Sequence, residues 1–267
     1  MEQAQVDRIN AFCADTRSAA FDPAAYTLAY GGADDAHIEK YNVHVENPGK
    51  KPNRVFIRQE PRSGPSEIRI RFFAEGGEVF IDGSNQVRGT IRVHADDCRT
   101  VIGGDNKQPS PFNITHWSRR TLVHIGRGTT SNGTNIVAMG EGAAILIAED
   151  CMFSTGIWVK SSDMHAIVDL ETDTMVNREG NAGDIEIGRH VWVGQDVLVT
   201  LGVKVGSGAI LGAKALIRED VPDRTLWAGV PARQLRENVS WLRAHVMVPQ
   251  ELEQVRTSLG LEPKAGS

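Results

Sequence analysis

An aspartate and a histidine, Asp163 and His165, occupy two positions where a regular apolar pattern predicts aliphatic residues. Residues two apart on extended backbone point to the same side, so we expect these two side chains to share one face. A carboxylate beside an imidazole can fix the orientation of the ring while its other nitrogen takes a proton, which is general-base chemistry. The alternative is that the chain has left its regular structure here and both are exposed loop residues.

The pattern that these residues interrupt consists of two rails of aliphatic residues, each with a spacing of six. The rails comprise Ile185, Val191, Val197, Val203, Ala209 and Ala215, and Ile187, Val193, Val199, Val205, Leu211 and Ile217. Each pair two residues apart points inward from one short strand, and the chain must turn before the next pair does so. Gly188 and Gly194 supply residues without a Cβ at such turns. This hexapeptide repeat predicts an all-β fold, a parallel β-helix whose coils bury their apolar residues on one another.

The extent of the repeat divides the chain into three parts. Residues 1–54 are expected to form a short helical or irregular segment. Residues 55–220 are expected to form the β-helix, with a loop insertion over residues 161–184 where the rails fail. Residues 221–267 are expected to form turns and capping helices.

Helical spacing marks both ends of the chain. Near the start, apolar residues recur at Val6, Ile9 and Phe12. Near the end, helical spacing predicts one helix through Val239, Leu242 and Val246, and a second through Leu252, Val255 and Leu259. We expect these C-terminal helices to cover the open end of the coil stack, because a solenoid needs a cap.

Composition excludes several classes of function. The 267 residues carry a net charge of −5, which gives no general reason to bind nucleic acid or anionic lipid. Cys13, Cys98 and Cys151 are odd in number and widely spaced, so neither a disulfide framework nor a metal site is indicated and a reducing cytoplasm is expected. No apolar run approaches membrane-spanning length, so no membrane insertion is predicted.

An outward-facing tryptophan is expected in the last coils. Trp192 lies between Val191 and Val193, which belong to the two rails, so strand alternation points its indole away from the core. A large outward aromatic residue marks either a subunit contact or a flat wall beside a ligand.

Basic residues gather at the end of the stack. Within a short stretch the chain carries Arg218, Arg224, Arg233 and Arg236, although its net charge is negative. Phosphate is the expected ligand of an arginine cluster, since guanidinium groups bind it through paired hydrogen bonds. The alternative is a solvated rim of charges with no ligand.

Two runs of the sequence resemble a known family. The run DIEIGRHVWVGQDVLVTLGVKVGSGAILGAKALIREDVPDRTLWAGVPARQLRE is similar to the C-terminal half of the hexapeptide-repeat, left-handed β-helix acyltransferases. The upstream run IAEDCMFSTGIWVKSSDMHAIVDLETD looks closest to members that acetylate surface polysaccharides, within the branch that also holds galactoside, maltose and nodulation-factor acetyltransferases. The left hand of the helix comes from this resemblance, because chirality rules alone favour right-handed crossovers.

The resemblance assigns expected roles to residues of the donor side. Trp192 matches the aromatic residue that lines the acetyl-donor groove, and Gln195 and Ala213 match positions whose backbone contacts the pantetheine arm. Arg233 and Arg236 match the basic pair that meets the phosphates of coenzyme A. The pattern departs at Glu219, where relatives usually carry lysine, and Arg218 next to it is a candidate to supply the missing charge.

Other matching residues belong to the acceptor side. His165 matches the general base, and Asp163 is a candidate to set its tautomer. Asn132 or Asn135 is a candidate to contact the acceptor. The insertion 167–183, which follows the base directly, is expected to shape acceptor selectivity.

The resemblance therefore implies an acetyl-coenzyme A-dependent O-acetyltransferase that acts on a sugar or a surface polysaccharide precursor. Transfer is expected to be direct, in a ternary complex, and the enzyme is expected to be a cytoplasmic homotrimer with sites between subunits and no metal. Three other functions stay open: an N-acetyltransferase of amino sugars, a γ-type carbonic anhydrase, and an inactive β-helix that serves assembly. For the carbonic anhydrase, the candidate ligands His116, His124 and His165 show no close paired motif.

Overall fold

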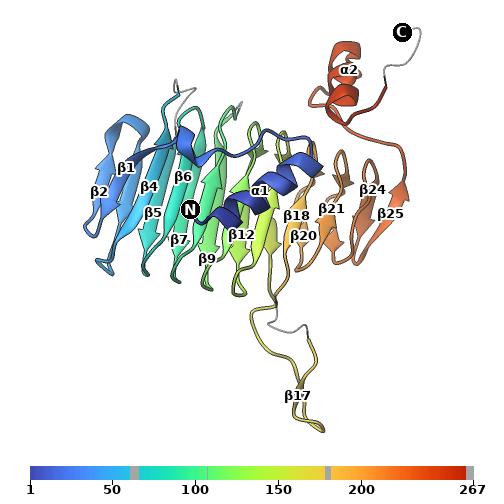
Figure 1. Ribbon diagram of the computed structural model, residues 1–267. Helices are drawn as coiled ribbons and strands as arrows, with labels where there is room; N and C mark the ends of the chain where they lie inside the picture. Colours follow the sequence, from blue (N-terminus) through green and yellow to red (C-terminus); the bar gives the residue numbers. More distant parts are fainter. Residues whose placement is uncertain (61–65, 107, 178–181, 263–267) are drawn as a thin grey trace.

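The computed structural model of the protein describes residues 1–60, 66–106, 108–177 and 182–262. The chain forms an elongated prism of stacked coils, a parallel β-helix as the repeat predicts (Figure 1). Across these described ranges, no helix is long and apolar enough to span a lipid bilayer.

Three sheets form the sides of the prism, and we name them A, B and C. Sheet A contains, in spatial order, β1 (Thr27–Gly32), β4 (Asn53–Arg58), β6 (Glu78–Asp82), β8 (Arg99–Ile102), β10 (Leu122–Ile125), β13 (Ala144–Ile147), β18 (Ile185–Ile187) and β21 (Lys204–Val205). Sheet B contains β2 (Ala36–Ile38), β3 (Val43–Glu46), β5 (Glu67–Phe72), β7 (Val87–Val93), β9 (Ser110–His116), β12 (Thr134–Ala138), β15 (Ile157–Lys160), β20 (Leu198–Val199) and β23 (Leu216–Ile217). Sheet C contains β11 (Thr130–Ser131), β14 (Met152–Phe153), β19 (Trp192–Val193), β22 (Ile210–Leu211), β24 (Leu226–Gly229) and β25 (Ala232–Arg236).

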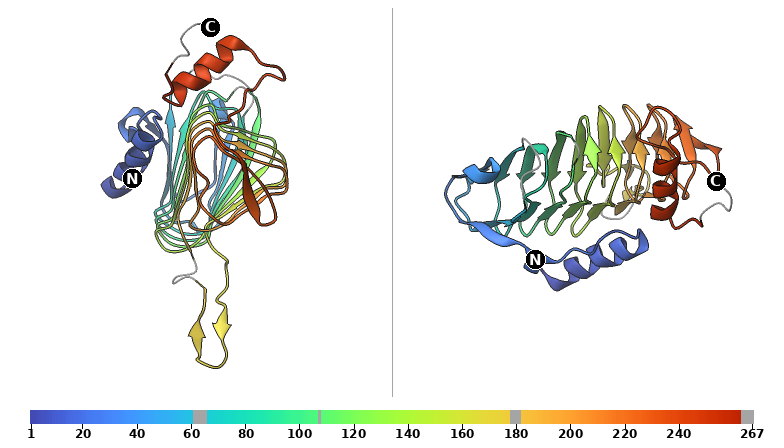
Figure 2. Two further views of the ribbon diagram at one scale, coloured as in Figure 1. Left: turned by 90° about the vertical axis from the view of Figure 1, so that its right-hand side faces the viewer. Right: turned by 90° about the horizontal axis from the view of Figure 1, so that it is seen from above.

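Each complete coil passes through sheets A, C and B in that order, as β18, β19 and β20 do. The prism therefore has an A/C corner, a C/B corner and a B/A corner, and the B/A corner lies opposite sheet C. The view along the axis shows this cross-section (Figure 2). Neighbouring strands within a sheet are parallel, except for the pairs β1–β4, β2–β3 and β24–β25.

Both predicted rails lie inside the prism. All twelve of their residues expose 3% or less of their surface, so the inward pairs of each coil stack on those of the next. The corners are as tight as the predicted glycines imply. A Cβ on Gly194 would lie 2.7 Å from the carbonyl oxygen of Leu211 in the following coil, a distance that no real side chain tolerates.

A helix covers sheet A from outside. Helix α1 (Gln3–Asp15) buries the predicted residues Val6, Ile9 and Phe12. They pack against outward-facing residues of sheet A such as Leu122 and Leu146, so this sheet has apolar residues on both faces. Short 3₁₀ helices follow at Pro23–Ala25 and Glu39–Tyr41.

The β-structure begins earlier than residue 55. Strands β1, β2 and β3 lie within the segment that sequence analysis left helical or irregular, and β3 already pairs in parallel with β5. The sequence pattern of β3 is weak because the strand is short. Only Val43 and Val45 point inward, and they alternate with His44 and Glu46. The first coil is closed by antiparallel strands, which carry no six-residue period.

The predicted helix through Val239, Leu242 and Val246 does not form. Instead, the segment makes bends, and Trp241 is buried at the A/C corner. The second predicted helix exists as α2 (Pro249–Ser258), with Val255 buried. It lies beside the later coils and not over the open end of the stack (Figures 1 and 2). The hairpin of β24 and β25 closes the last coil, with Trp227 and Ala232 inward.

An arm leaves the solenoid at the B/A corner. After β15 the chain forms the antiparallel pair β16 (Val168–Asp169) and β17 (Thr174–Met175), which projects from the prism, and it returns at β18 (Figure 1). Residues 178–181 of the expected insertion lie outside the described residues. The arm exposes five large apolar side chains: Ile167, Val168, Leu170, Met175 and Val176.

Candidate active site

His165 lies at the B/A corner, where the arm begins. The backbone there is a turn and not the extended strand that the spacing suggested: Met164 has a left-handed φ of 70°, and its N–H donates to Ser162 Oγ at 2.9 Å. Ser162 is buried, which anchors the turn, while Asp163 and His165 are exposed. The chain has thus left its regular structure here, as in the alternative that sequence analysis gave, and Asp163 and His165 are exposed residues of a turn and do not share one face of a strand.

Asn177, at the other end of the arm, holds the two candidate residues together. Its Nδ2 donates to the carbonyl oxygen of His165 at 3.1 Å and to Asp163 Oδ2 at 3.3 Å. Its Oδ1 accepts from the N–H of Ile167 at 3.0 Å. One amide side chain thus closes the neck of the arm and holds the backbone of the turn that carries His165. Sequence reasoning missed Asn177, because only the folded arm brings it back to the corner.

A small cavity lies beside this turn. It measures about 230 Å³ and is lined by Lys160, Ser162, Asp163, Met164, Leu198, Thr200 and Leu201. These residues come from the B/A corner of two successive coils, so the cavity is a notch between coils. It gives room for an acceptor group next to Asp163.

The donor-side residues lie on sheet C and the C/B corner. Trp192 points outward and is 38% exposed. Register places Ile210 beside Trp192, Leu226 beside Ile210 and Arg236 beside Leu226. Trp192 and Arg236 are thus three strand spacings apart, or about 14 Å, on one outer face.

Gln195 and Ala213 occupy the same corner on successive coils. The carbonyl oxygen of Gln195 accepts from the N–H of Lys214 at 2.7 Å, and both Gln195 and Ala213 are exposed. Arg233 pairs in register with Ala228 in the strand beyond them. The structure thus brings four of the expected donor-side residues, Trp192, Gln195, Ala213 and Arg236, onto one side of the prism.

Two charged residues behave differently from the expectation. Arg218 follows β23 in sheet B and so lies apart from Arg236, which is in sheet C. Glu219, at the position where relatives carry lysine, pairs with Arg233, with 3.0 Å between Arg233 Nη1 and Glu219 Oε1. The carboxylate therefore competes for a guanidinium expected to meet phosphate.

The two asparagines expected near the acceptor lie on different parts of the prism. Asn135 lies on the outer face of sheet B, beside Trp158 in the register, and its Oδ1 accepts from Asn113 at 3.5 Å. Asn132 lies after β11, at the C/B corner, and accepts from Gln108 at 3.3 Å. Only Asn135 shares a sheet with the strand that leads to His165.

The candidate base and the candidate donor face lie on opposite sides of one chain. His165 is at the B/A corner, whereas Trp192 is on sheet C, which that corner does not adjoin. The buried rails of the prism separate them. A site that uses both must therefore form between two chains.

A second histidine and aspartate pair joins the C-terminal segment to the prism. His190 Nδ1 lies 2.7 Å from Asp150 Oδ2, and His190 Nε2 lies 3.0 Å from the carbonyl oxygen of Trp241. Because His190 is 2% exposed and fully engaged, it holds structure and does not act as a base. Sequence reasoning did not single out this pair.

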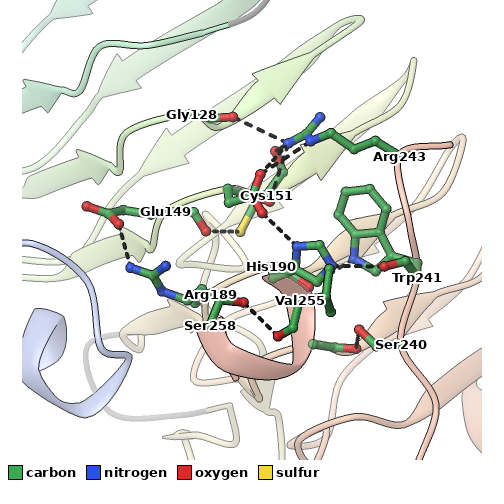
Figure 3. A network of polar contacts seen from close by, with 12 residues as sticks. Gly128, Glu149, Cys151, Arg189, His190, Ser240, Trp241, Arg243, Val255 and Ser258 are labelled. Carbon is green, nitrogen blue, oxygen red and sulfur yellow. Dashed lines mark hydrogen bonds and ion pairs between the residues drawn. The ribbon is translucent and has the colours of Figure 1, made fainter. Parts of the chain in front are cut away.

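Residues of the C-terminal segment complete the network (Figure 3). The Trp241 ring stacks on His190 at 4.4 Å between centroids, and its Nε1 donates to the carbonyl oxygen of His190 at 2.9 Å. Arg243 Nη2 lies 2.9 Å from Asp150 Oδ1. Since the Trp241 and Trp192 rings are 6.3 Å apart, this network sets one edge of the candidate donor groove.

The candidate zinc ligands do not converge. His116 points into the prism with no exposed surface and bonds Thr100 and Thr121 at 2.8 Å each. His124 is buried under α1, next to Phe12. Neither can meet His165 or reach a second chain. In the part of the chain that is described, no group of three or more His, Cys, Asp or Glu side chains has metal-binding geometry.

The three cysteines are buried and unreactive. None of them forms a disulfide with a described residue. Burial raises the pKa of the Cys13 thiol to about 11 and that of the Cys151 thiol to about 12, so both stay protonated near neutral pH. Neither acts as a nucleophile.

Known proteins share both the sequence and the fold of the chain. The polysialic acid O-acetyltransferase of Escherichia coli is 30% identical over 126 residues, which cover 47% of this chain and 40% of that protein. The galactoside O-acetyltransferase of Escherichia coli is 26% identical over 134 residues, which cover 50% of this chain and 62% of that protein. The chain thus spans less than two thirds of either relative. No protein-family model matches it.

Solved structures match a larger share of the chain. The crystal structure of the polysialic acid-specific acetyltransferase NeuO has a TM-score of 0.65 at 26% identity and covers 73% of this chain and 88% of its own. The polysialic acid O-acetyltransferase OatWY has a TM-score of 0.52 at 22% identity, with 72% and 93% covered, and supports the fold alone. The match with such neighbours identifies the solenoid as a left-handed β-helix.

We predict that Asp150→Asn loosens the C-terminal segment. Although burial opposes it, hydrogen bonds from His190 and Arg243 lower the pKa of the Asp150 carboxyl below its ordinary value. Because the carboxylate is partly exposed, we expect a loss of about 1–2 kcal/mol in the free energy of unfolding, measured by urea denaturation, and faster tryptic cleavage near Arg243.

The control is Asp196→Asn, at another corner aspartate with left-handed φ, which should leave both readouts unchanged. A carboxyl with a depressed pKa stabilises the fold above its ordinary pKa and loses that effect as the pH falls through its folded pKa. The difference between wild type and Asp150→Asn should thus be constant above about pH 5 and shrink below about pH 4. A difference that grows on acidification would contradict this assignment.

Proposed function

Because the chain belongs to the hexapeptide-repeat acyltransferases, in the branch of the sugar and polysaccharide O-acetyltransferases, we propose that it transfers an acetyl group from acetyl-coenzyme A to a hydroxyl of a saccharide. The observation that carries this proposal is an exposed histidine in the turn whose residues Asp163 and Met164 line a notch between coils, together with a separate outer face that runs from Trp192 to Arg236. The three buried free thiols suit a reducing cytoplasm.

In this proposal His165 is the general base. A sugar hydroxyl is too weak an acid to attack a thioester unaided near neutral pH, so a base must take its proton as the new C–O bond forms. The C–S bond of the thioester breaks, and the proton passes from His165 to the departing sulfur. Asp163 and Asn177 orient the histidine, and a backbone N–H of a neighbouring coil stabilises the negative charge on the carbonyl oxygen.

The donor binds along sheet C in this proposal. Trp192 forms a flat wall, the corner backbone at Gln195 and Ala213 borders the pantetheine arm, and Arg233 and Arg236 meet the phosphates. The separation of about 14 Å between Trp192 and Arg236 suits a long, thin ligand laid across the coils. Transfer is direct, since no described cysteine is an available nucleophile.

We propose a homotrimer as the active assembly. One chain supplies His165 and the next supplies the face with Trp192, because the two lie on opposite sides of one prism. Apolar side chains offer surface for the contact: Trp158, Leu198 and Leu216 form an outward row on sheet B, and the arm exposes Leu170 to 88%. A heterologous contact of this kind closes when three copies form a ring.

We predict that His165→Ala lowers kcat by about 100-fold or more, the contribution of a positioned base, and leaves acetyl-coenzyme A binding intact. Transfer of labelled acetyl to a panel of saccharides, read by mass spectrometry, measures the first effect, and calorimetry measures the second. His245→Ala, at another exposed histidine, is the matched control. Unchanged turnover of His165→Ala would remove the base assignment.

Glu219→Gln should strengthen donor binding. The substitution frees Arg233 from its carboxylate partner, so we expect the KM for acetyl-coenzyme A to fall about 2–5-fold at low salt, and less at high salt because ions screen exposed charges. The matched control is Glu186→Gln, which breaks an exposed pair with Lys204 on sheet A. An unchanged or higher KM would argue against phosphate binding at Arg233.

Complementation tests whether the site lies between chains. Chains that carry His165→Ala and chains that carry Trp192→Asp should each be nearly inactive alone. When the two variants are coexpressed and mix at random in a trimer, about a quarter of the sites should regain activity. A site between two chains can then combine the intact His165 of one chain with the intact Trp192 of the other. Activity that stays at the level of the separate variants would mean that each site is built from a single chain.

A further inference from the structure

Helix α1 reaches the corner from which the arm projects. Its Arg8 is half-buried, and Arg8 Nη1 donates to the carbonyl oxygen of Gly142 at 2.9 Å while Nη2 pairs with Asp184 Oδ2. Gly142 lies at the B/A corner before the arm, between β12 and β13, and Asp184 lies where the arm returns to β18. One guanidinium thus joins a helix outside sheet A to two successive coils. We call Arg8 and Asp184 the clasp.

The Asp184 carboxylate replaces a backbone contact. In the preceding coil, the first N–H of the strand in sheet A donates to the carbonyl oxygen before the next strand, as Leu122 does to Ala143 at 3.0 Å. At the return of the arm, the N–H of Ala144 donates instead to Asp184 Oδ1 at 3.0 Å. The insertion therefore leaves the first hydrogen bond between β13 and β18 to a side chain, and Arg8 holds the other oxygen of that side chain.

The turn of His165 is tied to the returning side of the arm. The N–H of Gly183 donates to the carbonyl oxygen of Ser161 at 2.8 Å. Ala182 forms an antiparallel bridge with Ser162, whose Oγ accepts the hydrogen bond within the turn. A displacement of the returning side is therefore passed to the turn.

Both sides of the arm rest on the preceding corner. On the departing side, Ser161 Oγ accepts from the N–H of Met139 at 2.9 Å and donates to its carbonyl oxygen at 2.8 Å. On the returning side, Ala182 packs on Gly140, which has a φ of 99° and where a Cβ would lie 2.0 Å from the Cβ of Ala182. Hydrogen bonds thus fix the departing side to this corner, and the clasp adds a polar anchor to the packing contact of the returning side.

We propose that Arg8 and Asp184 are positioning residues for acetyl transfer. The clasp fixes the returning side of the arm on the prism, and the contacts between the two sides of the arm then hold the turn of His165 at one place beside the notch. Helix α1 is in this way part of the support of the site, although it lies outside sheet A. The link to acetyl transfer rests on the proposed function, whereas the anchoring of the turn does not.

The clasp acts on position more than on overall stability. Its side chains are 34% and 48% exposed, and an ion pair so exposed contributes little to the free energy of unfolding. A small displacement of a base can nevertheless lower turnover many-fold, because proton transfer needs the reacting atoms within hydrogen-bonding reach. Measurements of local order and of turnover therefore separate the clasp from general stabilisation.

Hydrogen–deuterium exchange on the full chain tests the anchoring. Arg8→Ala should speed exchange about two- to fivefold in peptides that cover residues 139–146 and 161–166, because local opening becomes easier there. Arg8→Lys keeps the charge and should restore most of the protection. The matched control is Glu141→Gln, which breaks an exposed pair of 2.7 Å with Arg120, toward the preceding coil, and should leave exchange in residues 161–166 unchanged.

Kinetics test the positioning role. Arg8→Ala should lower kcat about three- to tenfold and leave the KM for acetyl-coenzyme A unchanged, because the clasp does not touch the donor face. Asp184→Asn keeps an acceptor for the N–H of Ala144 and should lower kcat by a similar factor, and the double variant should be no slower than either single one. Arg8→Lys should recover most of kcat. Glu141→Gln should keep the wild-type kcat, and its thermal midpoint should equal that of Arg8→Ala.

Three results would overturn the clasp. The first is that Arg8→Ala leaves exchange in residues 161–166 at the wild-type rate. The second is that Glu141→Gln lowers kcat as much as Arg8→Ala, since any exposed pair at this corner would then have the same effect. The third is that the double variant shows the product of the two single losses, since Arg8 and Asp184 would then act independently. If the wild type acetylates no saccharide, the proposed function fails together with the catalytic role of the clasp, while exchange still decides whether the clasp anchors the turn.

Discussion

The stacking of short parallel strands is the constraint on which the rest of this structure depends. Backbone hydrogen bonds hold each coil at the same height above the last, and the inward aliphatic pairs must meet the pairs above and below. A residue at one corner therefore recurs at that corner in the next coil. Side chains far apart in sequence become straight columns, and every candidate site in the molecule is made from such columns.

The closed prism has a consequence for catalysis. Its interior is filled by the rails, so Trp192 on sheet C and His165 at the B/A corner lie on opposite sides of one chain. In the proposed mechanism, the two sides of the crevice therefore come from two chains. The exposed apolar side chains of the arm and of the row on sheet B are the surface that this proposed association uses, and Asn177 joins the two ends of the arm at the turn of His165.

Positive charge is concentrated locally in this protein, although its net charge is negative. The net charge is −5, yet Arg233 and Arg236 lie together on β25 at the end of sheet C. In the proposed function these two residues meet the phosphates of the donor, and Glu219 offsets part of their positive charge through its pair with Arg233. A concentrated positive patch of this kind is needed because the net charge of the chain gives an anion no general attraction.

Sequence alone determined the features that repeat. A period of six and a side-chain alternation of two predict the inward pair Val191 and Val193, the tight corner at Gly194 and the outward direction of Trp192. The same period shows where the rails are interrupted, at His165. It did not determine what depends on contacts between distant segments. The bends around Trp241, where helical spacing suggested a helix, arise because that ring stacks on His190, and Asn177 meets His165 only after the arm folds back. Nor does any local pattern join Arg8 to Asp184, since residues 176 positions apart meet only when α1 packs on sheet A beside the arm.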